Sequence, residues 1–76
     1  MPMQLLTIDE YFAKTDFAIS TMVANNENHL LQRFVPVVEL LQSGDYTLAL
    51  CLAEVYQWSQ DLLDEMRLTF NILKVS

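Results

Sequence analysis

Residues 40–48 read LLQSGDYTL and hold the only glycine of the chain, which makes this stretch the clearest boundary between helices. Gly44 readily adopts the left-handed conformation that ends a helix, and Asp45 suits the N-cap of a following helix. Apolar residues recur at helical spacing on both sides of the stretch, without the alternation typical of strands. The pattern therefore predicts one helix that ends at about Gln42 and another that begins at about Asp45.

The segment after Gly44 predicts one long helix. It contains no proline and no further glycine, so we expect a helix over residues 45–73, which corresponds to a length of about 40 Å. On a helical wheel, nine of its residues form one broad face that we expect to pack on the other helices: Leu48, Leu52, Val55, Tyr56, Leu62, Leu63, Met66, Phe70 and Leu73.

The segment before Gly44 predicts a helix over residues 27–42, with an apolar surface that covers more than half of its circumference. Such a helix is usually buried on more than one side. Pro36 lies inside it, lacks a backbone N–H and clashes with the carbonyl four residues earlier. The helix must therefore either kink or break near Pro36, and we expect a kink.

The N-terminal segment predicts a further helix. Residues 7–10, TIDE, fit a capping box, in which the Thr7 hydroxyl accepts the Glu10 amide and the Glu10 carboxylate accepts the Thr7 amide. An apolar stripe at helical spacing follows, and the Asn25-Asn26 pair interrupts it. The predicted fold is all-α, a single-domain three-helix bundle of residues 1–76 with helices at about 8–24, 27–42 and 45–73.

The chain has more apolar residues than so small a domain can bury. Hydrophobic residues make up 53% of 76 positions, and a domain of this size buries only about 60% of the surface of its unfolded chain. On the wheels, several apolar residues lie off the core faces, and others lie at their edges. We name six of these as candidate protein-interface residues: Phe17, Leu50, Trp58, Leu68, Ile72 and Val75.

Three interpretations of these residues remain open: a frayed C-terminal end, association with a second copy, or contact with a different protein. Antiparallel pairing of two long third helices would place their acidic middle segments, around Asp61 and Glu65, against each other. Such like-charge contacts are unfavourable. A homodimer is therefore expected to use the helix ends or the first helix instead.

The charge of the chain disfavours several partners. The net charge is −6, from ten acidic and four scattered basic residues, whereas nucleic acid and anionic lipid both require clustered lysine and arginine. The longest apolar run, residues 48–53, is far shorter than the roughly 20 residues of a membrane span. A single cysteine and the lack of a basic leader favour a soluble cytoplasmic protein that binds neither nucleic acid nor membrane.

The sequence offers little catalytic or metal-binding chemistry. His29 is the only imidazole, so a histidine-based triad or a multi-histidine metal site is ruled out, and we expect His29 to be solvated. Cys51 stands between two leucines and is expected to be buried. Asp61 and Glu65 lack the further ligands of a metal cage. We therefore expect no enzymatic activity, no metal and no cofactor.

Residues 44–50, GDYTLAL, resemble the start of a helix in a tetratricopeptide-type repeat. The chain has no period near 34 residues and lacks the further signals of that repeat. We therefore interpret the stretch as a generic helix start and assign no family.

These observations together predict a non-enzymatic protein–protein interaction module. Such a chain would be a small acidic adaptor, a chaperone-like subunit or an inhibitor, and would bind another protein or its own copy through apolar helix faces. The alternative is an accessory or ligand-binding subunit of an enzyme, with an apolar pocket between the helices. A dimeric DNA-binding regulator is a third possibility, which the acidic charge disfavours.

Overall fold

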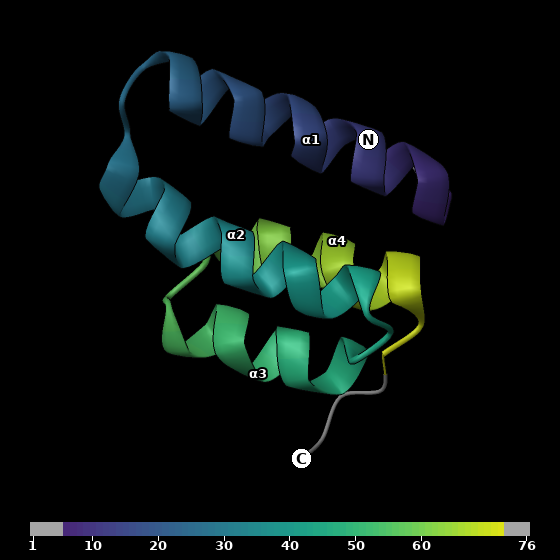
Figure 1. Ribbon diagram of the computed structural model, residues 1–76. Coiled ribbons are helices and arrows are strands. Elements are labelled where there is room, and N and C mark those ends of the chain that lie inside the picture. The colour runs from purple at the N-terminus through teal and green to yellow at the C-terminus, as the bar shows by residue number, and fades with distance from the viewer. Residues whose placement is uncertain (1–5, 73–76) are drawn as a thin grey trace.

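The computed structural model describes residues 6–72 and contains only helices in that range. This confirms the predicted all-α class, but there are four helices instead of three (Figure 1). Their bounds are Ile8–Ala24 for α1, Asn28–Gln42 for α2, Tyr46–Val55 for α3 and Gln60–Phe70 for α4. The first two agree with the predicted helices to within one residue.

The prediction of one long third helix is wrong, because the chain turns between α3 and α4. Gln57 adopts a left-handed conformation with φ of 61°. Its N–H donates to the Glu54 carbonyl, and the N–H of Trp58 donates to the Ala53 carbonyl, both at 3.0 Å. This pair of bonds is the Schellman motif, which ends a helix. Ser59 then begins α4, its hydroxyl accepting the Leu62 N–H.

The other three helices also end at a left-handed residue, namely Asn26, Gly44 and Asn71. Glycine adopts this conformation without strain because it has no side chain, so Gly44 suits its position. A residue with a side chain carries roughly 1–2 kcal/mol of steric strain in the same conformation. The end at Gln57 therefore has no glycine to mark it in the sequence. The signal that marks the turn is the next helix start, in which Ser59 caps and Asp61 lies in the first turn.

The predicted capping box at the start of α1 is confirmed. The Thr7 hydroxyl accepts the Glu10 N–H at 3.1 Å, and the Glu10 carboxylate accepts the Thr7 N–H at 2.9 Å. Hydrogen bonding of the Glu10 carboxylate to Thr7, to its backbone N–H first and its side chain second, lowers the pKa of Glu10 below its usual value. Two orphan N–H groups of the helix start are thereby satisfied.

Helix α2 lies between α1 and α3 and packs on both (Figure 1). It runs through Pro36 as one element, which excludes the break-and-restart alternative. Its burial on more than one side agrees with its wide apolar surface. Helix α4 contacts both α1 and α3, whereas α1 and α3 are not neighbours within residues 6–72.

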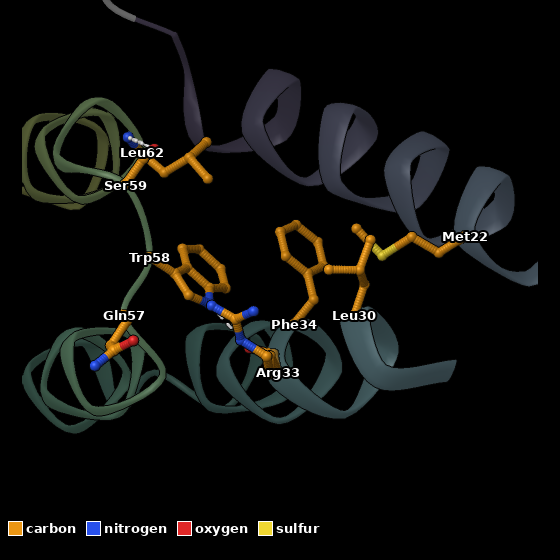
Figure 2. Close-up of a pocket in the computed structure, with 8 residues that line it drawn as sticks. All are labelled: Met22, Leu30, Arg33, Phe34, Gln57, Trp58, Ser59 and Leu62. Carbon is orange, nitrogen blue, oxygen red and sulfur yellow. Dashed lines mark hydrogen bonds between the residues drawn. The ribbon is translucent and has the colours of Figure 1, made fainter. Parts of the chain in front are cut away.

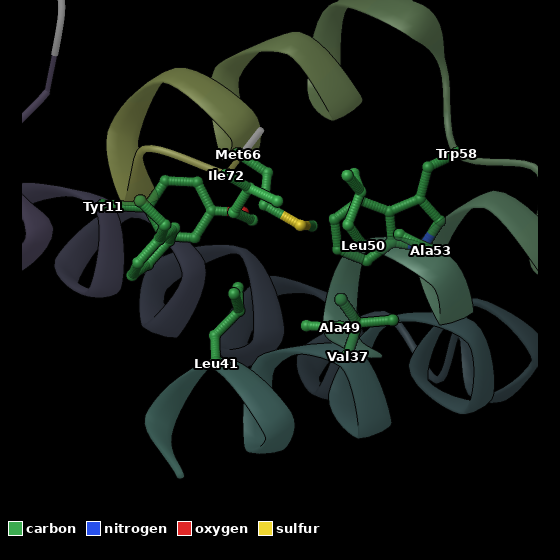
Figure 3. Packing of buried hydrophobic residues seen from close by; sticks show 10 residues of the cluster. Tyr11, Val37, Leu41, Ala49, Leu50, Ala53, Trp58, Met66 and Ile72 are labelled. Carbon is green, nitrogen blue, oxygen red and sulfur yellow. The ribbon is translucent and has the colours of Figure 1, made fainter. Parts of the chain in front are cut away.

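The core draws on all four helices and the two segments that follow α3 and α4 (Figure 3). Tyr11 of α1 meets the ring of Phe70 of α4 edge to face, with centroids 4.9 Å apart. Ala49 and Ala53 are fully buried on α3, and such small side chains let α2 and α3 approach closely. The buried apolar cluster consists of Tyr11, Val37, Leu41, Ala49, Leu50, Ala53, Trp58, Met66, Phe70 and Ile72.

The helix break also changes which residues of α3 face inward. Leu48 and Val55 were expected in the core but are 58% and 72% exposed. The wheel treated residues 45–73 as one straight helix, so it assigned one common inner face to both halves. Because the chain turns at Gln57, α3 and α4 orient independently, and α3 turns Ala49 and Ala53 inward instead.

Candidate functional site

An apolar groove lies between α1 and α4, and its floor comes from α2 and the turn that joins α3 to α4 (Figure 2). It consists of two adjoining cavities of about 200 and 210 Å³ that share four lining residues. The shared residues are Met22, Phe34, Trp58 and Leu62. We refer to the whole as the α1–α4 groove.

Aromatic rings of α1 and α4 meet at one end of the groove. There, Tyr11 packs on Phe70 and closes the space. Farther along α1, the positions that line the groove are Thr15, Ala18 and Met22. Thr15 and Ala18 are too short to fill the gap to α4, and the Thr15 hydroxyl is satisfied by the Phe12 carbonyl at 2.9 Å. The inner half of the groove is therefore apolar space without a side chain to fill it.

Two stacked aromatic rings form the floor of the groove. The rings of Phe34 and Trp58 are nearly parallel, with centroids 4.8 Å apart and an interplanar angle of 12°. The indole N–H of Trp58 donates to the Arg33 carbonyl at 2.9 Å. A buried indole with its N–H satisfied presents only apolar surface to the groove. The floor is therefore both apolar and fixed in orientation.

Arg33 ties the α3–α4 turn to α2 and lies at the rim of the groove (Figure 2). Its Nε and Nη2 donate to the Tyr56 carbonyl at 3.1 and 2.6 Å. That carbonyl belongs to the C-cap of α3, where helix carbonyls lack partners within the helix. Together with the bond from Trp58, these contacts fix the turn against α2 at two points.

An ion pair bridges α1 and α4 along the groove. Lys14 Nζ donates to both carboxylate oxygens of Glu65, at 2.8 and 2.9 Å. Burial raises the pKa of Tyr11 well above its ordinary value, and the nearby negative charge of Glu65 raises it further. The closed end of the groove thus disfavours ionisation of the Tyr11 phenol.

The candidate residues from the sequence do not form one surface. Phe17 and Leu68 are exposed, as expected, but they lie on different helices, α1 and α4. Leu50 and Ile72 were expected on the side away from the core, and this is wrong because both belong to the buried cluster. Trp58 is also buried. Val75 lies outside the described residues.

The helix ends explain two of these burials. Trp58 and Ile72 each directly follow a left-handed residue and donate their N–H back to a carbonyl of the last helical turn. In this motif the residue after the left-handed one commonly packs on the end of its own helix. Apolar side chains at these two positions therefore turn toward the core.

A second apolar surface was missed by the sequence analysis. Four residues of α3 at helical spacing i, i+3, i+4 and i+7 form an apolar strip, in which Leu48, Cys51 and Val55 are exposed and Leu52 is partly buried against the core. We call this set the outer α3 face. Cys51 was expected to be buried and is exposed instead. The sequence does contain a signal for this surface. Only Thr47 and Glu54 interrupt the apolar and aromatic residues of α3, so a helix this short cannot bury all of its apolar side chains.

Within residues 6–72, no three His, Cys, Asp or Glu side chains come close enough to hold a metal ion. His29 is exposed, as expected. In the same range, no helix combines the length and the hydrophobicity needed to cross a bilayer. No protein-family model, curated protein or solved structure matches the chain.

Proposed function

We propose that the chain is a non-enzymatic protein-binding module whose α1–α4 groove receives an apolar helical segment of a partner protein. The observation that carries this proposal is the lining of the groove. Met22, Leu30, Phe34 and Leu62 line it and all keep part of their surface exposed. Grooves of this kind, rimmed by polar residues, are typical sites for the apolar face of a partner helix.

The size of the groove favours side chains of a protein over one large ligand. Each cavity, at about 200 to 210 Å³, is smaller than the roughly 300–1,000 Å³ of typical small-molecule pockets. Two adjoining cavities instead suit two anchor side chains on one face of a helix, spaced one turn apart. Anchors of this kind supply most of the binding energy at helix-in-groove interfaces.

The charge of the walls indicates the chemistry of the partner. Helix α1 carries three carboxylates and one lysine, and α4 carries three carboxylates and one arginine. The two helices thus hold four of the six net negative charges, and the charged residues that line the groove itself are Lys14, Arg33 and Glu65. Both cations already pair with acids of α4: Lys14 with Glu65, and Arg67 with Asp64. A segment with lysine or arginine beside its apolar anchors therefore fits best.

A small apolar carboxylate is the second candidate ligand, because Arg33 lies at the rim of the groove. Its two hydrogen bonds to the Tyr56 carbonyl use two of the five N–H donors of a guanidinium. The remaining donors could hold a carboxylate while an apolar tail occupies the cavity. This ligand corresponds to an accessory or ligand-binding subunit.

Trp58 provides a built-in probe for the test, because it is the only tryptophan of the chain and lies on the floor of the groove. The probe ligand is a 14-residue amphipathic helical peptide, about four turns, with leucines on one face and lysines on the other. We expect a saturable change in Trp58 fluorescence. The same peptide with glutamates in place of the lysines should bind at least about tenfold more weakly.

A matched pair of variants on adjacent positions of α1 controls for non-specific binding. Ala18→Phe fills the groove and should abolish the fluorescence change, whereas Phe17→Ser removes an exposed ring outside the groove and should leave it intact. Octanoate, added alone, tests the carboxylate alternative. The proposal fails if the lysine peptide causes no change or if Ala18→Phe binds it as well as the wild type does.

A further inference from the structure

The outer α3 face is an uncovered apolar strip. Leu48 and Val55 are 58% and 72% exposed, and Cys51 between them is exposed as well. None of the four residues of this face lines the α1–α4 groove. The strip is therefore separate from the site proposed above, and what covers it has to be argued from its own surroundings.

Charge is distributed very unevenly around this strip. Glu54 is the only ionised residue of α3, whereas α1 and α4 together carry eight charged side chains. Helix α1 lies across α2 from α3, on the far side of the molecule (Figure 1). On its own helix, the outer α3 face has only Glu54, together with Asp45 at the N-cap, to repel a second copy of this chain of net charge −6.

From this distribution we infer that the outer α3 face is a self-association surface, which binds a second copy of the chain by antiparallel pairing of the two α3 helices. An uncharged apolar strip offers nothing to a cationic partner, but it is complementary to itself. The four positions are symmetric about the point between Cys51 and Leu52. A two-fold axis at that point sets Leu48 against Val55 of the second copy and brings the two Cys51 side chains together.

The helix break removes the objection that the sequence raised against this pairing. In one continuous helix, Asp61 and Glu65 would extend the paired surface and repel their counterparts. The left-handed residue Gln57 ends α3 before these acids, which lie on α4. The paired segment is then Tyr46–Val55, which contains Glu54 as its one carboxylate and has Asp45 at its N-cap.

The length of α3 sets the expected strength. Ten residues extend for only about 15 Å, and a standard interface buries about 800 Å² on each partner. One short helix face presents less than that area. We therefore expect a weak dimer, with a dissociation constant on the order of 10–100 μM.

Sedimentation equilibrium between about 5 μM and 1 mM tests the inference, and the structure offers a closely matched control. Val55 and Phe17 are equally exposed apolar residues, at 72% and 75%, on opposite sides of α2. Val55→Glu should raise the dissociation constant of the dimer at least about tenfold, because a two-fold interface contains each substituted residue twice. Phe17→Glu should leave it unchanged. A wild type that stays monomeric at 1 mM, or equal effects of the two variants, would overturn the inference.

Cys51 gives a second readout, because it is the only cysteine. When two helices pack with their axes about 8–10 Å apart, residues next to the two-fold axis have their α-carbons roughly 4.4–6.8 Å apart, the range that a disulfide needs. The two Cys51 residues lie next to that axis. Diamide should therefore convert the wild type to a disulfide-linked dimer. The double variant Cys51→Ser/Phe17→Cys moves the thiol to α1 and should crosslink at least about fivefold more slowly. Equal rates would contradict the pairing.

The test is independent of the proposed function. Val55→Glu should bind the lysine peptide with wild-type affinity, because Val55 lies outside the groove. Loss of dimerisation with intact peptide binding, or the reverse, identifies which of the two proposals fails.

Discussion

The α1–α4 groove and the outer α3 face are both apolar, but they differ in shape and in the charge beside them. The groove is concave and lies between two acidic helices, whereas the outer α3 face is a strip on a helix with one carboxylate. We expect a cationic segment at the first surface and a second copy at the second. On this proposal, neighbouring charge, more than apolarity itself, determines which partner each of the two surfaces accepts.

Both surfaces arise from one local event, the turn at Gln57. Ending α3 there places Trp58 on the floor of the groove and stacks it on Phe34. The same turn separates α3 from the acids of α4 and leaves Leu48 and Val55 exposed. A change at the turn should therefore affect both surfaces, and a change in either surface should leave the other intact.

Substitutions in the two regions should differ most in their effect on the free energy of unfolding. Trp58→Ala removes a buried ring and should lower the free energy of unfolding by about 3–5 kcal/mol, close to the whole stability of a small domain. Val55→Ala on the outer α3 face should cost less than about 0.5 kcal/mol. Urea denaturation followed by circular dichroism measures both. Trp58→Phe, which loses the indole hydrogen bond but keeps an aromatic ring, gives an intermediate loss if the Ala variant fails to fold.

The closed end of the groove predicts a dependence of stability on alkaline pH. The pKa of Tyr11 is raised in the folded protein by burial and, less strongly, by Glu65. The folded state therefore holds the phenol proton more tightly than the unfolded state does. Stability from this group is fully present below about pH 10 and falls above it by up to about 1.4 kcal/mol per pH unit. Tyr11→Phe should flatten that slope in urea titrations between pH 9 and 11; an unchanged slope would contradict the assignment.

A substitution at Gln57 tests the turn that creates both surfaces. The sign of the resulting change in stability distinguishes a turn from a continuous helix. Gln57→Gly relieves a left-handed side chain with φ of 61° and should stabilise the fold by about 0.5–1 kcal/mol. In an uninterrupted helix over residues 45–73, the same substitution would destabilise by a similar amount. Thermal unfolding gives the sign. As a control, Ala13→Gly at an exposed position inside α1 should destabilise.

The helix boundaries that the sequence predicts are those with local signals. Thr7 and Glu10 mark the start of α1, Asn25 and Asn26 mark its end, and Gly44 marks the end of α2. Each signal acts through bonds between residues a few positions apart, so no knowledge of the fold is needed to find it.

The turn at Gln57 was missed because no glycine or proline marks it. Its conformation depends on contacts far along the chain, above all the packing of Trp58 on Phe34 and its bond to the Arg33 carbonyl. Wheel arguments that assumed a continuous helix then misplaced Leu48 and Leu50, one predicted inside and found exposed, the other the reverse. An inter-helix pocket was anticipated as an alternative, but its lining could not be, because it depends on that turn.

Chemical-shift mapping of the backbone amides can show whether the two surfaces accept different partners, because one kind of spectrum follows both surfaces. On dilution from about 1 mM to 20 μM, shifts should move within α3, around Leu48 and Val55. On addition of the lysine peptide at low protein concentration, they should move around Met22, Trp58 and Leu62 instead. Two separate sets of perturbed residues are the predicted result. Perturbation of the same residues by dilution and by peptide would contradict the claim that the two surfaces accept different partners.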